Sequence, residues 1–191
     1  MAGRIVVLGA AGFIGRHLCA DLNRRGLHVT AAIRTEKGAP IAGADETVIR
    51  SFDVVDDFVD LLSRNDWLIH AASETTPGRS ALRPALEFET TLRHASALIE
   101  ALQRVPQCKV IYLSSGGTVY GDCGDRRPSE DEALRPRSYY GAGKAAVEMF
   151  LRGWSSQHGG DVVAIRPSNV YGPGQDYEGG FGIIPAAFNS V

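Results

Sequence analysis

The sequence contains few cysteines and no long hydrophobic run, and each absence excludes a class of protein. The chain has 191 residues and three cysteines, Cys19, Cys108 and Cys123. An odd number without metal-type spacing argues against a disulfide framework and a metal site, and it fits a reducing compartment. The apolar run that follows Arg4 is too short for a signal peptide or a membrane span. We therefore expect a cytoplasmic protein with no membrane partner and no metal.

A strong charge of one sign is also absent. The net charge is -2, and acidic and basic residues are spread along the chain. A nucleic-acid partner would need a basic patch, so none is expected and a small ligand is favoured. Hydrophobic residues make up 44% of the chain and charged residues 22%, and this balance predicts a globular domain with a sizeable core.

Short β-branched runs alternate with helical patterns along most of the chain. This alternation is typical of βαβ units, and strands that are nearly all apolar are typical of a parallel sheet covered on both faces. We predict strands over residues 4–9, 28–33, 46–52, 66–72, 109–115 and 161–168. We predict helices over residues 13–25, 56–63, 84–104 and 139–157. The expected fold class is therefore α/β, a Rossmann-type doubly wound parallel sheet.

Two segments depart from this pattern. Residues 121–137 combine turn-forming and charged residues, and we expect them to form a surface loop. After a Rossmann domain over residues 1–171, residues 172–191 are expected to begin a C-terminal substrate-binding lobe, with a helix from about Ile184. This helix has no terminating signal before Val191, which predicts that the chain is a fragment.

Three glycines follow the first predicted strand. Gly9, Gly12 and Gly15 are spaced as in "GAAGFIG", and Phe13 and Ile14 open the helix that follows. Glycine lets the backbone turn sharply and approach a pyrophosphate, whose charge is stabilised at the positive end of a helix. Because the motif lies in the first βα unit, it predicts a site for NAD or NADP rather than a tight turn alone.

The ends of the next strands offer further cofactor contacts. At the end of the second strand Arg34 stands where an acidic residue would bind an adenosine ribose, and an arginine there favours NADP unless it is merely solvated. Asp53, beside Val54, is expected either to accept a hydrogen bond from the adenine or to cap the next helix. His70, followed by two alanines, either borders a flat cofactor or is a buried, satisfied histidine.

Tyr140 and Lys144 lie four residues apart in "SYYGAGK", within a helical pattern that places them on one face. A lysine ammonium beside a phenol stabilises the phenolate and lowers the tyrosine pKa toward the range of a general base. Such a pair can remove a proton from a sugar or alcohol hydroxyl. Taken alone, a tyrosine and a lysine at this spacing are common and usually structural, but their conjunction with a cofactor motif is much rarer.

With these motifs in order, the chain resembles an extended short-chain dehydrogenase/reductase of the NAD-dependent epimerase/dehydratase family, the group of nucleotide-sugar epimerases. The matching segments are "GAAGFIG", "FDVVD", "HAA", "LSSGGTVYG", "EDEALRPRSYYGAGK" and "IRPSNVYGPG". The resemblance implies that Tyr140 is the base, that Lys144 also holds the nicotinamide ribose and that Asn169 touches the substrate diphosphate. Arg166 and Pro167 would shape the cofactor wall.

The chain departs from the family pattern at two places. The family usually has Ser or Thr four residues before the tyrosine of "VYG", and here that position is Gly116. Ser115, Thr118 or a water would then bond the sugar hydroxyl, and Ser115 is preferred because adjacent glycines can redirect it. The turn has no acidic residue, which disfavours a 4,6-dehydratase. Thr91 replaces the family's asparagine, which holds a water of the proton relay.

The expected site therefore has three parts. Its catalytic residues are Tyr140, Lys144, Ser115 and Thr118. Its cofactor-binding residues are Gly9, Gly12, Phe13, Ile14, Gly15, Arg34, Asp53, Val54, His70, Ala71, Ala72, Ser114, Tyr140, Lys144, Arg166 and Pro167. Its substrate-binding residues are Ser115, Gly116, Thr118, Tyr140 and Asn169.

By this resemblance we predict an NAD(P)-dependent nucleotide-sugar 4-epimerase that removes a hydride from the sugar and returns it to the other face. One alternative is an NADPH-dependent reductase of a keto sugar or another carbonyl, which Arg34 favours. The other is a non-catalytic NAD(P)-binding regulator. The resemblance also implies a homodimer, formed through the helices that begin at Pro84 and Tyr139.

Overall fold

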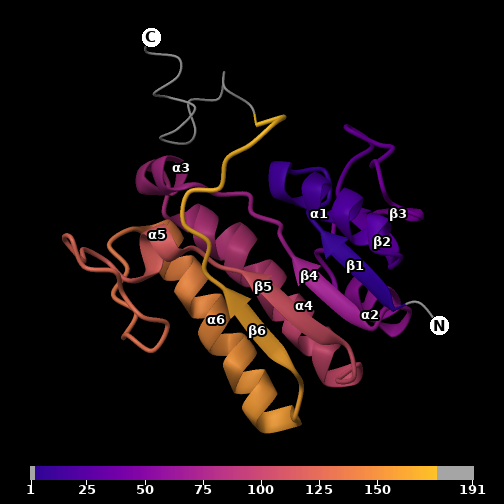
Figure 1. The fold of residues 1–191 in the computed structure, drawn as a ribbon. Coiled ribbons are helices and arrows are strands. Elements are labelled where there is room, and N and C mark those ends of the chain that lie inside the picture. Colours follow the sequence, from indigo (N-terminus) through magenta and orange to yellow (C-terminus); the bar gives the residue numbers. More distant parts are fainter. Residues whose placement is uncertain (1–2, 176–191) are drawn as a thin grey trace.

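A six-stranded parallel sheet forms the centre of the molecule (Figure 1). The structure is a computed structural model that describes residues 3–175. Its strands are β1 (Arg4–Leu8), β2 (His28–Ile33), β3 (Glu46–Ile49), β4 (Trp67–His70), β5 (Lys109–Leu113) and β6 (Val162–Ile165). Their order is β3-β2-β1-β4-β5-β6, so the chain winds outward from β1 in both directions. This order confirms the predicted Rossmann-type fold.

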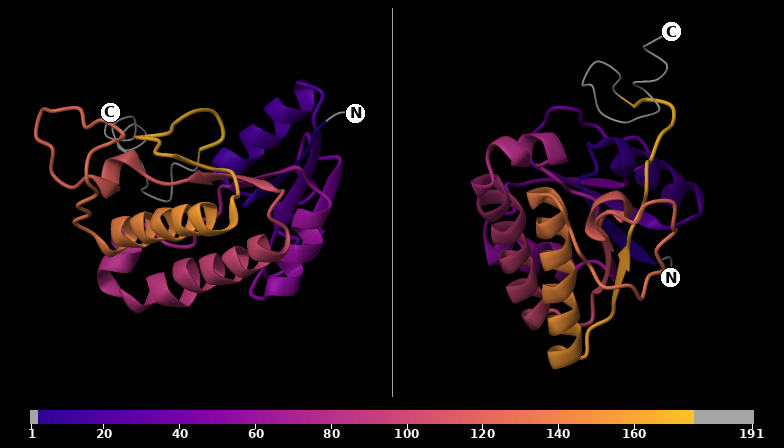
Figure 2. Two further views of the ribbon diagram at one scale, coloured as in Figure 1. Left: turned by 90° about the horizontal axis from the view of Figure 1, so that it is seen from below. Right: turned by 90° about the vertical axis from the view of Figure 1, so that its left-hand side faces the viewer.

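Helices connect most of the strands and lie on both faces of the sheet. They are α1 (Phe13–Arg24), α2 (Val55–Ser63), α3 (Pro77–Leu82), the π-helical turn η1 (Glu87–Leu92), α4 (Arg93–Arg104), α5 (Gly116–Val119) and α6 (Tyr139–His158). Figure 2 shows α4 and α6 side by side on the face of the sheet opposite α1. Among the helices of residues 3–175, none has the length and apolar character needed to cross a membrane.

The alternation of side chains along β1 divides the core into two parts. Val6 and Leu8 belong to the larger cluster, which also contains the buried faces of α2, α4 and α6. Ile5 and Val7 point the other way and pack with Cys19 of α1 and with β2. Because side chains alternate between the faces of a strand, a wholly apolar strand fits a position between two helical layers.

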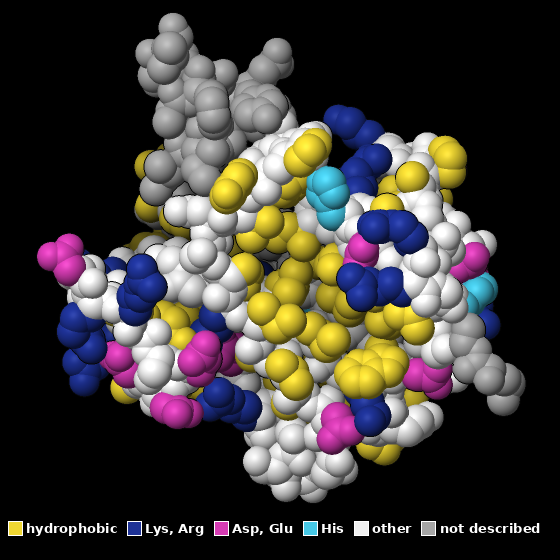
Figure 3. Space-filling model, viewed as in Figure 1, with side chains coloured by type: hydrophobic (Ala, Val, Ile, Leu, Met, Phe, Trp, Pro, Cys, Tyr) yellow, Lys and Arg dark blue, Asp and Glu magenta, His cyan; other side chains and the backbone are white. Residues whose placement is uncertain are grey.

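The two edge strands are not covered on both faces, although their sequences predicted that they would be. In β6, Val162 and Ala164 pack against the larger core, whereas Val163 is 57% and Ile165 45% exposed. In β3, Ile49 is 41% exposed. Figure 3 shows hydrophobic side chains gathered over the face of β4, β5 and β6 that lies beside α1. Within residues 3–175, α1 covers the β1 and β2 half of this face, and the β6 half is exposed.

The helix predicted over residues 84–104 is divided into η1 and α4. Two short helices were not predicted. One is α3, whose start carries a readable signal, because the Thr76 hydroxyl accepts a hydrogen bond from Arg79 N and Pro77 occupies the first turn. The other is α5, whose sequence GGTV has low helix propensity. The loop at 121–137 contains no helix or strand, as predicted, and the helix expected from Ile184 lies outside the described residues.

Candidate active site and cofactor cavity

A cavity of about 500 Å³ opens at the carboxyl ends of β1, β2 and β4. The order of the strands reverses between β1 and β4, which is where ligands bind in open α/β sheets. Ten of the predicted cofactor-binding residues line it, namely Gly9, Gly12, Phe13, Ile14, Gly15, Arg34, His70, Ala71, Ala72 and Lys144.

The glycine-rich turn brings the start of α1 to the cavity. Gly9 has φ +87°, and a side chain at Gly15 would overlap the Gly9 carbonyl oxygen, so both positions require glycine. Gly12 is the N-cap of α1 and provides no side-chain cap, and the first turn contains no acidic residue. The amide groups there remain available for a negatively charged ligand, and a pyrophosphate fits this position.

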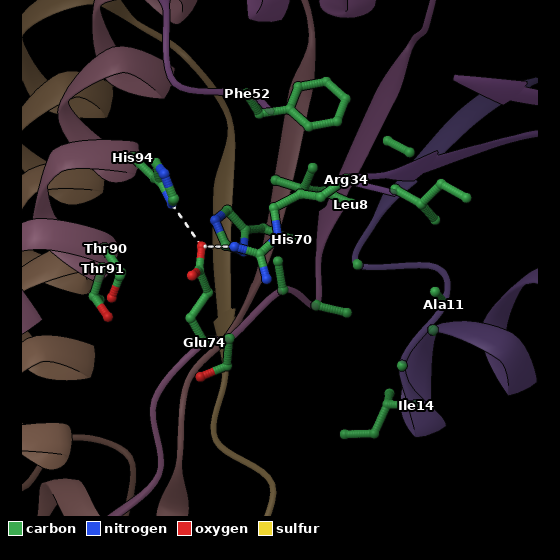
Figure 4. A pocket seen from close by; sticks show the side chains of 18 of the residues that line it. Leu8, Ala11, Ile14, Arg34, Phe52, His70, Glu74, Thr90, Thr91 and His94 are labelled. Atoms are coloured by element: carbon green, nitrogen blue, oxygen red, sulfur yellow. Dashed lines mark ion pairs between the residues drawn. The ribbon is translucent and has the colours of Figure 1, made fainter. Parts of the chain in front are cut away.

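Charged and titratable side chains form a connected series at the side of the cavity where the adenosine is predicted to bind, and Figure 4 shows its members Arg34, Glu74 and His94. Arg34 Nη1 lies 2.5 Å from Oε1 of Glu74, a residue of the loop after β4. His94 Nδ1 lies 3.4 Å from the same oxygen, and His94 Nε2 lies 2.7 Å from Asp53 Oδ1. Arg93 Nη2 contacts the same Asp53 oxygen at 2.8 Å. The sequence pointed to Arg34 and Asp53 but missed Glu74 and His94.

One of the two predicted roles of Asp53 was to cap α2, and this prediction is wrong. The N-cap of α2 is Val54, which makes no side-chain cap hydrogen bond and is 55% exposed. The Asp53 carboxylate instead bonds His94, and this bond is the main cause that lowers the pKa of Asp53. Neither Asp53 nor Val54 lies among the cavity-lining residues, whereas the neighbouring Phe52 does, with an unusual φ of 57°.

His70 is buried at the end of β4 and faces the cavity. Its ring packs edge-on against Tyr112, with 5.4 Å between the ring centroids. Its Nδ1 has no hydrogen-bond partner among the described residues, so the interpretation as a satisfied histidine is wrong. Burial lowers the pKa of His70 to about 3, and the ring is therefore neutral at physiological pH.

Lys144 lies at the floor of the cavity, one helical turn after Tyr140. Only 5% of the residue is exposed, and its Nζ donates to the carbonyl of Leu113 at 3.0 Å. The same Nζ lies 5.8 Å from the ring centroid of Tyr140. Burial lowers the pKa of Lys144 to about 8, because an ammonium group is disfavoured away from water.

Of the adjacent residues Tyr139 and Tyr140, Tyr140 is the more buried. Tyr139 is 54% exposed, whereas Tyr140 is partly buried beside Lys144. Burial raises the pKa of Tyr140 in this structure. The group that lowers this pKa is Ser73, through a hydrogen bond whose effect is smaller than that of burial, so the lowering of the Tyr140 pKa predicted from Lys144 is not found.

The π-helical turn places a carboxylate that the sequence did not indicate. Glu87 is 4% exposed, and its Oε2 accepts a hydrogen bond of 2.9 Å from the Thr91 hydroxyl. Oε1 has no partner among the described residues, and a side chain at Gly143 of α6 would approach Oε2 to 2.5 Å. The charge of Glu87 raises the pKa of both Tyr140 and Lys144, although burial remains the larger influence on each. Thr91 lines the cavity, with its hydroxyl directed to Glu87.

The turn after β5 forms helix α5, and Ser115 is its N-cap. Gly116 does not have positive φ, so conformational freedom is not the reason for glycine here. A side chain at Gly116 would lie 2.7 Å from the Arg166 carbonyl oxygen, so close approach of two backbone segments requires it. The hydroxyls of Ser114 and Thr118 are buried without a hydrogen-bond partner in residues 3–175.

The side chain of Arg166 lies away from the main cavity, although it was predicted to shape the cofactor wall. It lines a second cavity of about 510 Å³. There it pairs with Glu148 of α6 at 2.7 Å and donates to the Tyr120 hydroxyl at 2.7 Å. Pro167 contributes its carbonyl to Gly116 N at 2.8 Å. Asn169 is exposed, and the next residue, Val170, lines the main cavity.

The parallel sheet, the glycine-rich turn and the Tyr-Lys pair define a short-chain dehydrogenase/reductase of the extended type. The profile of the "NAD dependent epimerase/dehydratase family" matches residues 5–191, and the chain belongs to this family. The family resemblance carried by the sequence motifs is thus confirmed, together with the NAD-dependent character of the family.

Known relatives include enzymes of more than one reaction type. The chain is 33% identical over 189 residues to a UDP-glucose 4-epimerase of Mycolicibacterium smegmatis, an alignment that covers 95% of this chain and 60% of the relative. It is 28% identical to a dTDP-4-dehydro-6-deoxyglucose reductase of Escherichia coli, with 98% and 62% covered. The structure of a Thermus thermophilus UDP-glucose 4-epimerase in complex with NAD superposes with a TM-score of 0.85 at 30% identity, with 97% and 60% covered.

The chain spans about 60% of the length of these relatives.

Proposed function

We propose that the cavity binds NAD and that the full-length protein is a nucleotide-sugar 4-epimerase with Tyr140 as its general base. The observation that supports this most is the position of the Tyr140 and Lys144 pair at the carboxyl edge of the sheet. The same cavity is lined by Lys144 and by the uncapped start of α1. The proposed proton acceptor is thus one helical turn away from a residue that lines the proposed diphosphate site.

The residues present fit a nicotinamide dinucleotide. The amides at Phe13 and Ile14, at the uncapped start of α1, suit the pyrophosphate, and Ala71 and Ala72 leave space for a flat ring. When bound, NAD+ supplies a hydride acceptor that can return the hydride to the opposite face of the oxidised sugar.

Tyr140 takes the proton from the sugar hydroxyl as the carbon is oxidised and returns it when the carbon is reduced. Lys144, held by the Leu113 carbonyl, stabilises the phenolate that forms. The hydroxyl of Ser115 or of Thr118 holds the sugar hydroxyl in place. Asn169 meets the substrate diphosphate, and the exposure of this residue leaves it accessible.

Two features favour an epimerase over its rivals. A reductase was favoured by an Arg34 free to bind a 2'-phosphate, but Arg34 is paired with Glu74. A 4,6-dehydratase was disfavoured because the turn after Ser115 has no acid, and α5 consists of Gly, Gly, Thr and Val.

The decisive experiment mixes the full-length protein with UDP-, GDP- and dTDP-sugars, with and without added NADH or NADPH. Chromatography follows the sugars and absorbance follows the cofactor. An epimerised sugar with no net change in cofactor supports the proposal. Stoichiometric oxidation of NADPH would establish a reductase instead, and cofactor binding without any product would favour a regulator.

A further inference from the structure

We propose that Glu74 selects NAD over NADP by supplying the acidic group that is missing from the end of β2. The inference rests on the proposed cofactor binding and adds a residue that determines its specificity.

Taken alone, the residues at the end of β2 would favour binding of the 2'-phosphate of NADP. In many dinucleotide sites an acidic residue here binds the hydroxyls of the adenosine ribose, whereas an arginine accommodates the 2'-phosphate of NADP. This chain has Ile33 and Arg34 at the end of β2 and no acid there.

The fold brings an acid to the same place from another strand. Glu74 follows β4, and its Oε1 lies 2.5 Å from Arg34 Nη1 at the wall of the main cavity. The Glu74 side chain is 24% exposed, so it can still accept a hydrogen bond from a ribose hydroxyl. Arg34 already has a carboxylate partner, and its charge is therefore compensated.

Glu74 is also restrained from its other side. His94 Nδ1 lies 3.4 Å from the Glu74 oxygen (Figure 4). Asp53 lies 2.7 Å from the opposite nitrogen of the His94 ring. Arg93 in turn pairs with Asp53. The ion pair with Arg34 keeps the Glu74 carboxylate at the cavity wall, and His94 adds to this restraint when its ring carries both protons.

Glu74 should raise the affinity for NAD and lower the affinity for NADP. A free ribose hydroxyl can donate to the Glu74 carboxylate, which is a favourable charge-assisted hydrogen bond. A 2'-phosphate would place negative charge beside that carboxylate and compete with it for Arg34. Removal of the Glu74 charge should therefore release Arg34 for the phosphate.

The test measures the dissociation constants of NAD+ and NADP+ by isothermal titration calorimetry, on the wild-type full-length protein and on Glu74→Gln. We expect the wild type to prefer NAD+, and we expect Glu74→Gln to bind NADP+ about tenfold more tightly than the wild type does. Glu89→Gln is the matched control, because Glu89 pairs with Arg83 on the surface and does not line the cavity. Its two constants should stay at the wild-type values.

A second variant shows whether Arg34 carries the gain. In Glu74→Gln combined with Arg34→Ala, the gain for NADP+ should disappear. A second substitution, Glu74→Ser, repeats the test in case glutamine perturbs the loop.

The outcomes separate this inference from the proposed function. If the wild type binds NAD+ but the ratio of the two constants is unchanged in both Glu74 variants, Glu74 does not select the cofactor. The inference is equally overturned if the gain survives loss of Arg34. If the wild type binds neither dinucleotide, the proposed function itself fails and the inference fails with it.

Discussion

Tyr140 is the proposed base, yet burial raises its pKa. The cation of Lys144 lies 5.8 Å from the ring centroid and is held by a backbone carbonyl. Opposite charge near a phenol favours the phenolate, and exclusion of water strengthens that effect. Lys144 is therefore expected to stabilise the phenolate that acts as the base, against the opposing effect of burial.

Replacement of the phenol tests this role directly. Tyr140→Phe should lower kcat by about 100-fold or more, which is the usual contribution of a general base. The dissociation constant of NAD+ should change little, because Tyr140 is not among the residues that line the cavity. Steady-state kinetics and calorimetry measure the two quantities. Tyr139→Phe is the control and should retain activity, whereas full activity in Tyr140→Phe would remove the assignment.

Glu87 should set the pH range in which this pair operates. Its negative charge raises the pKa of Tyr140 and of Lys144 alike. In Glu87→Gln both values fall, so the acid limb and the alkaline limb of the kcat/KM profile should both move to lower pH. The profile of Glu89→Gln, an exposed acid of the same π-helical turn, should not move. A lower rate with an unmoved profile in Glu87→Gln would mean that Glu87 acts only through packing.

At the scale of elements, helix α6 determines where Tyr140 and Lys144 lie. The Ser138 hydroxyl caps its start by accepting a hydrogen bond from Gly141 N at 3.0 Å. Gly141 then lies so close to α5 that a side chain would approach the Thr118 carbonyl oxygen to 2.5 Å. The contact joins the helix that carries the base to the turn that carries the candidate substrate hydroxyls.

Two glycines of this helix give a matched test of that contact. Gly153 has open space around its Cβ position, so Gly153→Ala should stabilise the protein by about 1 kcal/mol through helix propensity. Gly141→Ala should destabilise it, because overpacking against backbone outweighs propensity. Urea unfolding measures both changes in free energy. A gain in stability for Gly141→Ala would show that α5 yields and that the contact does not fix the turn.

The helices and strands show which parts of the fold can be predicted from local sequence patterns. The apolar strands and the spacing of Gly9 and Gly15 predicted the parallel sheet and its first turn, because those signals depend on neighbours in the chain. The π-helical turn was not predicted, since nothing local distinguishes it from the first turns of α4. It nevertheless decides where the Glu87 carboxylate lies.

At the scale of the whole molecule, the contacts that the sequence did not predict all join residues that lie far apart in the chain. Glu74 meets Arg34 across the sheet, Asp53 meets His94 from 41 positions away, and Arg166 meets a buried Glu148. A partner so distant in sequence leaves no periodic signal, so the roles of Arg34, Asp53 and Arg166 could be read only from the folded chain. By contrast, the site role of a glycine that the local backbone conformation requires, such as Gly9, could be predicted from the sequence.

Stability of the whole fold should depend on pH through His70. Burial lowers its pKa to about 3 from 6.5, so the unfolded chain binds a proton between these values while the folded chain does not. Stability is therefore complete above about pH 6.5 and falls as the pH drops toward 3. One pKa unit corresponds to about 1.4 kcal/mol, so the loss amounts to several kcal/mol.

The free energy of unfolding, measured in urea between pH 4 and pH 7, tests this dependence. In that range His70 dominates, because paired carboxylates such as Asp45 and Asp53 have lowered pKa values and lose their effect below about pH 4. His70→Leu should flatten the dependence, since leucine cannot take up a proton and fits a buried position beside Tyr112. His158→Gln, at the exposed end of α6, should leave it in place. A slope in His70→Leu equal to that of the wild type would mean that His70 takes up its proton in the folded protein, with its Nδ1 hydrated from the cavity that it lines.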